Sequence, residues 1–445
     1  MKKVLVYGLK KSGEAVVGFL HGKYELIVYD DSEKNIKEFE KRNSKKFSFE
    51  ILKNINQLKD IDFAVISPAI PFQNKLVEYL IKNNIKVENE LDFAAKFILG
   101  DVVAVTGTNG KSTVVSLIYE ILKKEFLSCF LAGNIGVPLT SIIARTKEYS
   151  KVVVETSSFQ LERVFNLKPK IAVFLNIAPD HILRHGSFDN YFNSKKNIFK
   201  NQDGDDYTVL NYDDEKIKLI KTTAQTFYFS LNECVEGVFV KNNKVYFKKE
   251  NLEEEICVLD DLNLSVDCFL QNYLAAICVC KLLKVSNLSI VSAIKEFKSL
   301  EHRYENFLTK NNVSFINDSK ATNVASTLAA LNITKKRCHL LLGGSDKGEN
   351  FDELFKMVKE REIIPYIFGE TKNEMIMSAK KHNVKFLEFS SFKVAVESAV
   401  LSARENEVVL LSPACASFDE FSCFEERGDC FKEIVKSIYE KNSFY

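Results

Sequence analysis

Residues 102–113 read VVAVTGTNGKST, an apolar run that leads into a glycine-containing turn. The β-branched and small residues of 102–105 are typical of a buried strand. Residues 111–124 then carry the apolar spacing of a helix. A strand, a glycine turn and a helix in this order form the repeating unit of proteins in which helices cover a parallel sheet. The stretch therefore predicts an α/β fold, and the chain on either side of it repeats the same rhythm.

The turn within this stretch, residues 106–113, has the composition of a phosphate-binding loop. Glycines allow backbone N–H groups to face a polyphosphate, and the N-terminus of the following helix adds positive potential. Lys111 would reach the β- and γ-phosphates of a nucleotide, and Ser112 can ligate Mg²⁺. The strict GxxxxGK[ST] pattern requires glycine at position 105, where this chain has Val105. A plain strand-to-helix turn is the alternative, but the flanking strand and helix favour nucleotide binding.

The strand–helix rhythm starts three times along the 445 residues, which predicts three domains. We expect a Rossmann-like domain at 1–97, a central P-loop ATPase domain with a mainly parallel sheet at 98–298, and a C-terminal Rossmann-like α/β domain at 299–445. The expected strands are 3–7, 25–29, 62–66, 102–105, 152–155, 171–176, 207–211, 314–317, 339–342, 366–368 and 408–411, with a hairpin over 238–247 and helices over 111–124 and 270–283.

Composition narrows the class of protein. Lys and Arg number 61 against 60 Asp and Glu, so the net charge of +1 argues against a general binder of nucleic acid. Hydrophobic residues make up 46% of the chain, enough for several cores, and no window approaches the ~20 apolar residues of a membrane span. The first apolar stretch ends at Gly8, which is too early for a signal peptide.

The ten cysteines contain no CxxC pair, and several lie in apolar runs. This pattern favours buried free thiols in a reducing cytoplasm over disulfides or a zinc site.

A second glycine turn, residues 8–13, follows the first expected strand, and Asp30 ends the second. Two of the three glycines of GxGxxG are present, with Lys10 in the middle position. Asp30 stands where the acid of a dinucleotide-binding domain would bond a ribose. The turn by itself leaves three interpretations open: dinucleotide binding, another phosphate-bearing ligand, or a purely structural turn.

Polar residues follow further strands of the central range. Glu155 ends a strand near the phosphate loop, where a carboxylate can hold Mg²⁺, or it is an acid at a helix N-terminus. His181 follows the next strand and reads equally well as a metal ligand or a surface histidine. Lys195 reads locally as an ordinary lysine on an exposed helix face, no different from Lys196.

In the last range, three of the four expected strands end in polar turns, at 317–323, 343–348 and 412–421. The carboxyl ends of parallel strands meet at one edge of a sheet. We therefore expect these three turns to line one crevice, because loops that were polar only from solvation would not coincide so often.

Together these motifs resemble the Mur ligase family, ATP-dependent enzymes that form amide bonds in peptidoglycan assembly. The resemblance spans all three expected domains. Its most discriminating piece is LLSPACASFDEFSCFEERG at 410–428, which is similar to the member that adds D-glutamate to UDP-N-acetylmuramoyl-L-alanine. We expect a monomer acting on these small molecules in cytoplasmic precursor synthesis.

The resemblance implies a role for each matching residue. ATP would be bound by Gly107, Thr108, Asn109, Gly110, Lys111, Ser112, Thr113, Asn272, Arg303, Asp318 and Lys320. Two Mg²⁺ ions would be held, one by Ser112 and Glu155 and the second by His181 and a carbamylated Lys195. Lys111, His181 and Lys195 would be catalytic. The UDP substrate would face Gly8, Leu9, Lys10, Ser12, Asp30, Ser67, Pro68, Asn134 and Ser157. D-Glutamate would be held by Thr322, Lys347, Ser417 and Phe424.

The chain departs from the family pattern at two places. A His-Asn pair is common a few residues before the asparagine that matches Asn272, and this chain has Cys268-Phe269 there. A nucleotide contact would then be missing, or replaced by Gln271. Lys10 and Lys11 also make the first turn more basic than is usual, which would add contacts to a diphosphate or leave two exposed charges.

Two rival functions stand beside this one. Another ligase of the superfamily, such as a folylpolyglutamate synthase, fits the ATP loop but not the first domain or the 412–428 stretch. A P-loop GTPase or motor ATPase fits the loop alone. A GTPase requires NKxD for guanine, and no such tetrapeptide occurs in the chain.

Overall fold

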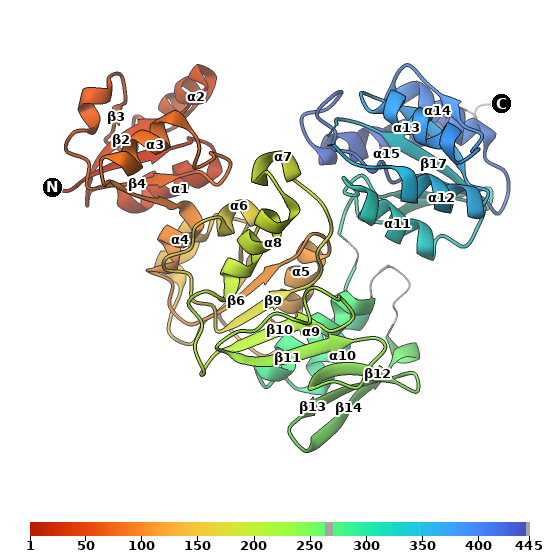
Figure 1. Ribbon diagram of the computed structural model, residues 1–445, viewed down its shortest axis with the longest axis horizontal. Coiled ribbons are helices and arrows are strands. Elements are labelled where there is room, and N and C mark those ends of the chain that lie inside the picture. Colours follow the sequence, from red (N-terminus) through yellow and green to blue (C-terminus); the bar gives the residue numbers. More distant parts are fainter. Residues whose placement is uncertain (263–269, 299, 347, 442–445) are drawn as a thin grey trace. The chain divides into compact units, whose positions relative to one another are not determined.

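The computed structural model describes residues 1–262, 270–298, 300–346 and 348–441. Lys347 and Cys268-Phe269, three of the positions singled out above, lie outside the described residues. The chain forms two compact units. The first comprises Met1–Ile177, Asp189–Leu262 and Gln271–Glu296, and the second is built mainly from Phe297–Tyr445 and also includes Ala178–Phe188. Three sheets provide the frame, two in the first unit and one in the second (Figure 1).

The first sheet has five parallel strands in the order β3-β2-β1-β4-β5. Alternate residues of β1 pack on opposite faces, Val4 and Val6 in one core and Leu5 and Tyr7 in the other. The strands are β1 Lys3–Tyr7, β2 Glu25–Tyr29, β3 Glu50–Ile51, β4 Phe63–Ile66 and β5 Lys86–Asn89, and the helices are α1 Lys11–Leu20, α2 Glu33–Asn43, α3 Lys75–Lys82 and α4 Glu90–Ala95. The β-turn-α rhythm predicted here is confirmed.

The second sheet has nine strands in the order β14-β13-β12-β11-β10-β9-β6-β8-β7. It is parallel from β7 to β12, and β13 and β14 then extend it with antiparallel pairing. The strands are β6 Asp101–Thr106, β7 Cys129–Gly133, β8 Lys151–Glu155, β9 Ile171–Phe174, β10 Tyr207–Asn211, β11 Gln225–Ser230, β12 Gly237–Lys241, β13 Lys244–Lys249 and β14 Leu252–Val258. Its longer helices are α5 Lys111–Leu122, α8 Phe188–Lys196, α9 Leu270–Leu282 and α10 Asn287–Glu296.

Two details of this sheet bear on the sequence predictions. The hairpin is confirmed, since β12 and β13 are joined by Asn242 and Asn243 with φ of 49° and 60°. The strand expected over 171–176 ends earlier, at Phe174. The reason is that Asn176 leaves the ladder and exchanges two side-chain hydrogen bonds with the backbone of Asn109 in the phosphate loop, at 2.8 and 3.0 Å.

The third sheet has the order β15-β16-β20-β17-β18-β19, and within it only β15 pairs in an antiparallel way. Helices α14 and α15 pack on one face and α11, α12 and α13 on the other. The strands are β15 Glu305–Lys310, β16 Val313–Asn317, β17 Cys338–Gly343, β18 Ile364–Phe368, β19 Leu387–Glu388 and β20 Val408–Leu411, and the helices are α11 Val324–Ile333, α12 Asp352–Glu360, α13 Lys372–Lys381, α14 Phe392–Ser402 and α15 Phe424–Lys441. The three strands with polar turns, β16, β20 and β17, are adjacent and parallel, so their carboxyl ends lie at the same edge of the sheet, whereas the crevice expected there stays a prediction.

Helix α4 ties the first sheet to the second within one unit. The buried carboxylate of Asp92 accepts hydrogen bonds from the backbone N–H groups of Phe165, Asn166 and Leu167 at 2.9 to 3.1 Å. Glu90 accepts two more from Thr140, both at 2.7 Å. The predicted domain boundary near residue 97 therefore separates two sheets but not two compact units, and the three-domain division stays a prediction.

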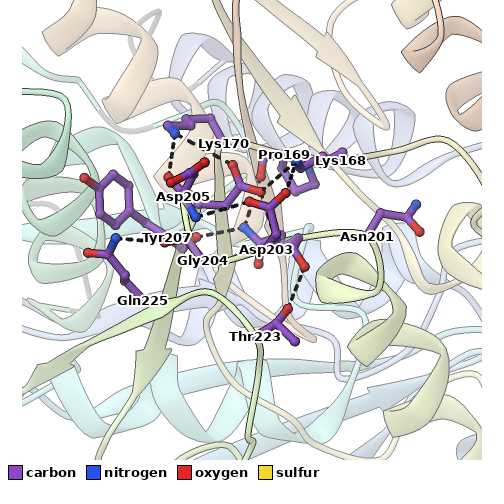
Figure 2. A network of polar contacts seen from close by, with 12 residues as sticks. Lys168, Pro169, Lys170, Asn201, Asp203, Gly204, Asp205, Tyr207, Thr223 and Gln225 are labelled. Atoms are coloured by element: carbon purple, nitrogen blue, oxygen red, sulfur yellow. Dashed lines mark hydrogen bonds and ion pairs between the residues drawn. The ribbon is translucent and has the colours of Figure 1, made fainter.

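A separate polar network lies at the edge of the second sheet where β9, β10 and β11 begin (Figure 2). Lys168 pairs with Asp203 at 2.5 Å, and Lys170 donates to the carbonyl of Asp205 at 2.5 Å. Gln225 donates to the carbonyl of Gly204 at 2.9 Å. The hydrogen bond from Lys168 lowers the pKa of Asp203. The loop that contains Asp203 and Asp205 is thus neutralised by lysines of the same unit. It lies at the amino ends of the strands, whereas the phosphate loop lies at the carboxyl end of β6.

The nine described cysteines are free; Cys257, Cys278, Cys280, Cys338 and Cys415 are buried, whereas Cys234 is exposed. In the described residues, every helix is too short or too polar to cross a membrane.

Candidate active site

The phosphate loop occupies the carboxyl end of β6, between that strand and α5. Gly110 has φ of +83°, and a Cβ there would lie 2.4 Å from Oδ1 of Asn272, so only glycine allows this asparagine to approach. Lys111 folds back over the loop and donates to the carbonyls of Gly107 and Thr108 at 2.9 and 2.8 Å. The ammonium group therefore already lies over the cradle in which phosphates would bind.

Three buried polar atoms near this loop have no hydrogen-bond partner among the described residues: Oγ1 of Thr113, Oε2 of Glu155 and Nδ2 of Asn272. Buried polar groups are nearly always paired, so each one requires an explanation. The three belong to α5, β8 and α9, which lie far apart in the sequence. Such a group of donors and acceptors suits a polar ligand.

Glu155 is 1% exposed and ends β8. Its Oε1 accepts a hydrogen bond from Nδ2 of Asn134 at 2.7 Å, which leaves Oε2 unpaired within the described chain. The alternative reading, an acid at the N-terminus of α6 (Ser158–Leu161), is not supported, because Ser157 caps that helix in a capping box with Gln160. Asn134 thus contacts Glu155 directly, whereas the side chain of Ser157 binds Gln160.

Lys195 is 2% exposed, so its reading as a solvated surface lysine is wrong. Its Nζ donates to the carbonyl of Gly107 at 2.7 Å and lies 4.8 Å from the ring centroid of Tyr191. The hydroxyl of Tyr191 is 3.1 Å from Oγ1 of Thr108. Helix α8 packs this face against the phosphate loop, whereas Lys196 is only partly buried. The spacing of Tyr191 and Lys195, one helical turn apart, was the available signal.

His181 belongs to the second unit with Ala178–Phe188. Its backbone N–H donates to Oδ1 of Asp180 at 2.9 Å, and its Nε2 lies 3.6 Å from Oδ2 of the same residue. Both interpretations of His181, metal ligand and surface histidine, stay open.

In the first sheet, the turn at 8–13 meets the ends of β2 and β4. Oδ2 of Asp30 accepts the N–H of Leu9 at 2.8 Å, and Oδ1 accepts the N–H of Ser32 at 3.0 Å. A Cβ on Gly8 would lie 2.5 Å from Cβ of Ser67. The Asp30 carboxylate therefore stabilises the turn through the N–H of Leu9, and this supports a structural role for Asp30. The exposed Lys10 and the contact of this turn with a UDP substrate stay predictions.

The second unit gathers the polar ends of β16 and β20. Oδ1 of Asp318 accepts the N–H of Tyr304 at 3.1 Å, and Oδ2 accepts the hydroxyl of Ser412 at 2.8 Å. Nζ of Lys320 lies 3.8 Å above the ring centroid of Phe424. The structure thus brings together the predicted residues Asp318 and Lys320 after β16 and Phe424 at the start of α15. Thr322 and Ser417 lie in the turns after β16 and β20. Arg303 is next to His302, whose carbonyl accepts the N–H of Lys320 at 3.0 Å.

Arg427 is the residue that sequence reasoning missed. It is 1% exposed, and burial lowers its pKa to about 10. Its guanidinium donates to the carbonyls of Ser319, Cys415 and Ala416 at 2.9 to 3.1 Å and to Oγ of Ser319 at 3.0 Å. One side chain therefore joins the turns after β16 and β20. Its position inside the 410–428 stretch was the only signal.

His302, next to the predicted Arg303, is a second residue of this region to which the sequence assigned no role. It is 4% exposed, and its Nδ1 is 2.9 Å from Nδ2 of Asn317. A Cβ on Gly428 would lie 2.2 Å from this nitrogen, so the glycine makes room for the ring. Gln271, considered as a substitute nucleotide contact, donates to Oδ2 of Asp213 at 3.1 Å instead.

A phosphate loop at the carboxyl end of a mainly parallel sheet defines the class of nucleotide-binding α/β proteins, and the buried groups around it that have no partner among the described residues suit a polar ligand. Comparison with known proteins then identifies the family. The model of the Mur ligase middle domain matches residues 105–280, and that of the Mur ligase glutamate ligase domain matches 302–415. The chain belongs to the Mur ligase family.

Two relatives match almost the whole chain. A UDP-N-acetylmuramoylalanine--D-glutamate ligase of Koribacter versatilis (strain Ellin345) is 38% identical over 99% of this chain and 98% of its own. A protein of the same name from Thermoanaerobacter sp. (strain X514) is 37% identical over 98% of both.

Solved structures agree on the fold. A pseudomurein peptide ligase type C from Methanothermus fervidus superposes with a TM-score of 0.61, at 19% identity, covering 98% of this chain and 100% of that one. A MurF ligase from Thermotoga maritima, solved in complex with ADP, gives 0.61 at 17% identity and covers 98% of each chain.

Proposed function

We propose that this chain is an ATP-dependent ligase that joins D-glutamate to UDP-N-acetylmuramoyl-L-alanine, in the synthesis of peptidoglycan precursors. The observation that carries the proposal is the convergence of Lys111, Lys195 and the unpaired groups of Glu155 and Asn272 on one phosphate loop. The choice of substrates rests on the full-length relatives named for that reaction.

A carboxylate is a poor acyl donor, because its leaving group would be oxide. Transfer of the γ-phosphoryl group of ATP to the carboxylate of the UDP substrate would give an acyl phosphate, from which the amine of D-glutamate displaces phosphate. The transfer brings two anions together. Lys111 would reduce their repulsion, since its ammonium group is held at the loop by the carbonyls of Gly107 and Thr108.

The residues near the loop fit one Mg²⁺ ion. Magnesium prefers hard oxygen ligands, and Oε2 of Glu155 is a buried carboxylate oxygen without a partner in the described chain. We propose that Ser112 and Glu155 hold this ion. Bound Mg²⁺ supplies positive charge that stabilises the phosphates during transfer.

A second ion would be held by His181 and Lys195. The Nζ of Lys195 acts here as a donor to Gly107, so an unmodified lysine does not suit a cation. Carbamylation, in which the neutral amine would add to CO₂ and lose a proton, would give a carbamate whose oxygens can ligate a cation, and it would reverse the local charge. We therefore propose the second ion only together with carbamylated Lys195.

We propose that the remaining predicted residues bind the amino acid, the UDP group and the nucleotide. Thr322, Ser417 and Phe424 would hold D-glutamate, together with Lys347. The turn at 8–13 with Asp30, Ser67 and Pro68 would hold the UDP group, and Arg303, Asp318 and Lys320 would serve the nucleotide. We also propose three Rossmann-like or P-loop domains at 1–97, 98–298 and 299–445, in a monomeric cytoplasmic enzyme.

The test is product formation with three amino acids, D-glutamate, L-glutamate and meso-diaminopimelate. Phosphate release should require both D-glutamate and the UDP substrate, and D-glutamate should be preferred at least about a hundredfold. Lys111→Ala should reduce turnover by two to three orders of magnitude or about 3–4 kcal/mol, as for other lost transition-state contacts. Asp203→Ala, at the opposite sheet edge, is the matched control. Comparable ligation of L-glutamate, or near-normal turnover of folded Lys111→Ala, would contradict the proposal.

A further inference from the structure

The turn that follows β20, residues 412–421, contains two acidic side chains that bind backbone of other elements. Oδ2 of Asp419 accepts the N–H of Glu370 at 3.2 Å, in the turn after β18. Both carboxylate oxygens of Glu420 accept the N–H of Phe392, at 3.0 and 3.3 Å, where α14 begins. The two acids therefore attach the turn to two neighbouring elements.

The residues around each of these two hydrogen-bonded contacts are suited to it. Gly369 lies against Asp419, and a Cβ there would be 2.6 Å from Oδ2, so the approach of the carboxylate requires a glycine. Ser391, the N-cap residue of α14, makes no capping hydrogen bond with its side chain, and Glu420 supplies an acceptor to the first turn instead.

The residues that precede Ser417 in this turn are also held by hydrogen bonds. Arg427 binds the carbonyls of Cys415 and Ala416, and the N–H of Ser345 donates to the carbonyl of Ala416 at 2.9 Å. Ser417 and Phe418 are thus bracketed by fixed backbone on both sides. Phe418 is 72% exposed, so burial of this residue does not hold the turn.

Charge alone would not favour Asp419 and Glu420 near a binding site for D-glutamate. D-Glutamate carries two carboxylates at neutral pH, and nearby negative charge raises the free energy of binding such a ligand. Two acids beside Ser417, a residue assigned to D-glutamate, therefore need another reason for their presence. Fixing a loop in its binding conformation before the ligand arrives reduces the entropy cost of binding.

We propose that Asp419 and Glu420 are positioning residues that set the affinity for the amino-acid substrate by holding Ser417 and Phe418 in place. They act through backbone and do not touch the substrate. The inference rests on the proposed function and adds a determinant of amino-acid binding to it.

The test uses the full-length chain and measures kcat and KM for each substrate separately. Asp419→Ala and Glu420→Ala should each raise KM for D-glutamate about fivefold or more, the effect of one net hydrogen bond. KM for ATP and for the UDP substrate should change less than twofold. Asp419→Asn keeps an acceptor oxygen without the charge, so its KM for D-glutamate should return to within twofold of wild type.

The matched control is Glu397→Ala, an acid of α14 that binds no backbone of this turn and should leave all constants unchanged. The sign of the effect separates the explanations. If the acids act only through charge, both Asp419→Ala and Asp419→Asn should lower KM for D-glutamate. That result, an unchanged KM, or equal loss for all three substrates would overturn the inference. Absence of D-glutamate ligation by wild type would instead refute the proposed function.

Discussion

At the scale of single residues, Lys195 shows most clearly how packing changes the meaning of a side chain. A lysine is rarely buried unless it is paired. Here the Nζ of Lys195 is held by the carbonyl of Gly107, at the start of the phosphate loop, and Tyr191 links the same helix to Thr108. An amine in this position is close to any phosphate that the loop binds. This makes Lys195 a functional candidate by its place alone, before any modification is considered.

We predict that Lys195→Ala loses most of the ligase activity, on the order of a hundredfold or more. If the side chain is carbamylated, short carboxylic acids such as acetate or formate should partly restore turnover, because they supply the missing oxygen ligands. Product formation at increasing acetate concentration measures this.

Lys196→Ala is the control, since Lys196 is less buried and lies beside Lys195 on the helix; it should be nearly silent. Equal behaviour of the two variants would remove Lys195 from the site. Loss of activity without rescue by any small acid would retain Lys195 as a residue of the phosphate loop and reject the carbamate.

At the scale of elements, α4 is the joint between the first two sheets. Its acidic side chains bind backbone and hydroxyl groups of the central part, at Thr140 and at Phe165 to Leu167. Burial raises the pKa of Glu90, and this effect outweighs the two hydrogen bonds from Thr140 that act in the opposite direction. The protonated form of Glu90 is therefore favoured by folding.

A raised pKa in the folded state fixes the sign of the pH dependence. The contribution of Glu90 to stability is fully present below the ordinary glutamate value of 4.5 and is lost as the pH rises through the raised value. Glu90→Gln keeps an oxygen for Thr140 and cannot ionise. We expect the variant to be more stable than wild type at pH 8, by on the order of 1 kcal/mol, with the difference shrinking toward pH 5.

Chemical denaturation of both proteins at pH 5 and pH 8 measures this difference. Glu148→Gln, which removes an exposed carboxylate of the same unit, should show none. A Glu90→Gln variant that is less stable at pH 8 would mean that the charge of Glu90 is stabilising after all.

At the scale of the whole molecule, the proposed nucleotide residues divide between the two units. The phosphate loop, Glu155, Lys195 and Asn272 belong to the first, whereas Arg303, Asp318 and Lys320 belong to the second. The resemblance to the Mur ligase family implies that all of them bind one ATP molecule. The proposed reaction would then need both units, although each has its own cores.

We predict that Arg303→Ala impairs ATP-dependent turnover by about tenfold or more, because a guanidinium that binds phosphate oxygens makes charge-assisted hydrogen bonds. Steady-state kinetics with varied ATP measures the effect. Arg337→Ala, an exposed arginine of the same unit that pairs with Glu407, is the control. Unchanged turnover and unchanged KM for ATP in Arg303→Ala would show that the second unit does not serve the nucleotide through this residue.

The sequence by itself determined the α/β class, the strands β1, β2 and β10 to the residue, the hairpin at Asn242-Asn243, and the phosphate loop with its flanking strand and helix. These features depend on residues close together in the chain, such as alternating apolar positions and glycine at a turn. Strand direction also predicted that the turns after β16, β17 and β20 emerge at one edge of a parallel sheet, and the structure adds that the three strands are neighbours.

Only the tertiary structure decided the burial of Lys195, the hydrogen bonds of Arg427 and the attachment of α4. Lys195 meets a carbonyl 88 positions away, and Arg427 meets Ser319 at a separation of 108. Periodicity places a residue on a helix face, but it does not say what covers that face. That depends on which distant segments pack together, and the low dielectric of the resulting interior then gives a buried charge its chemical role.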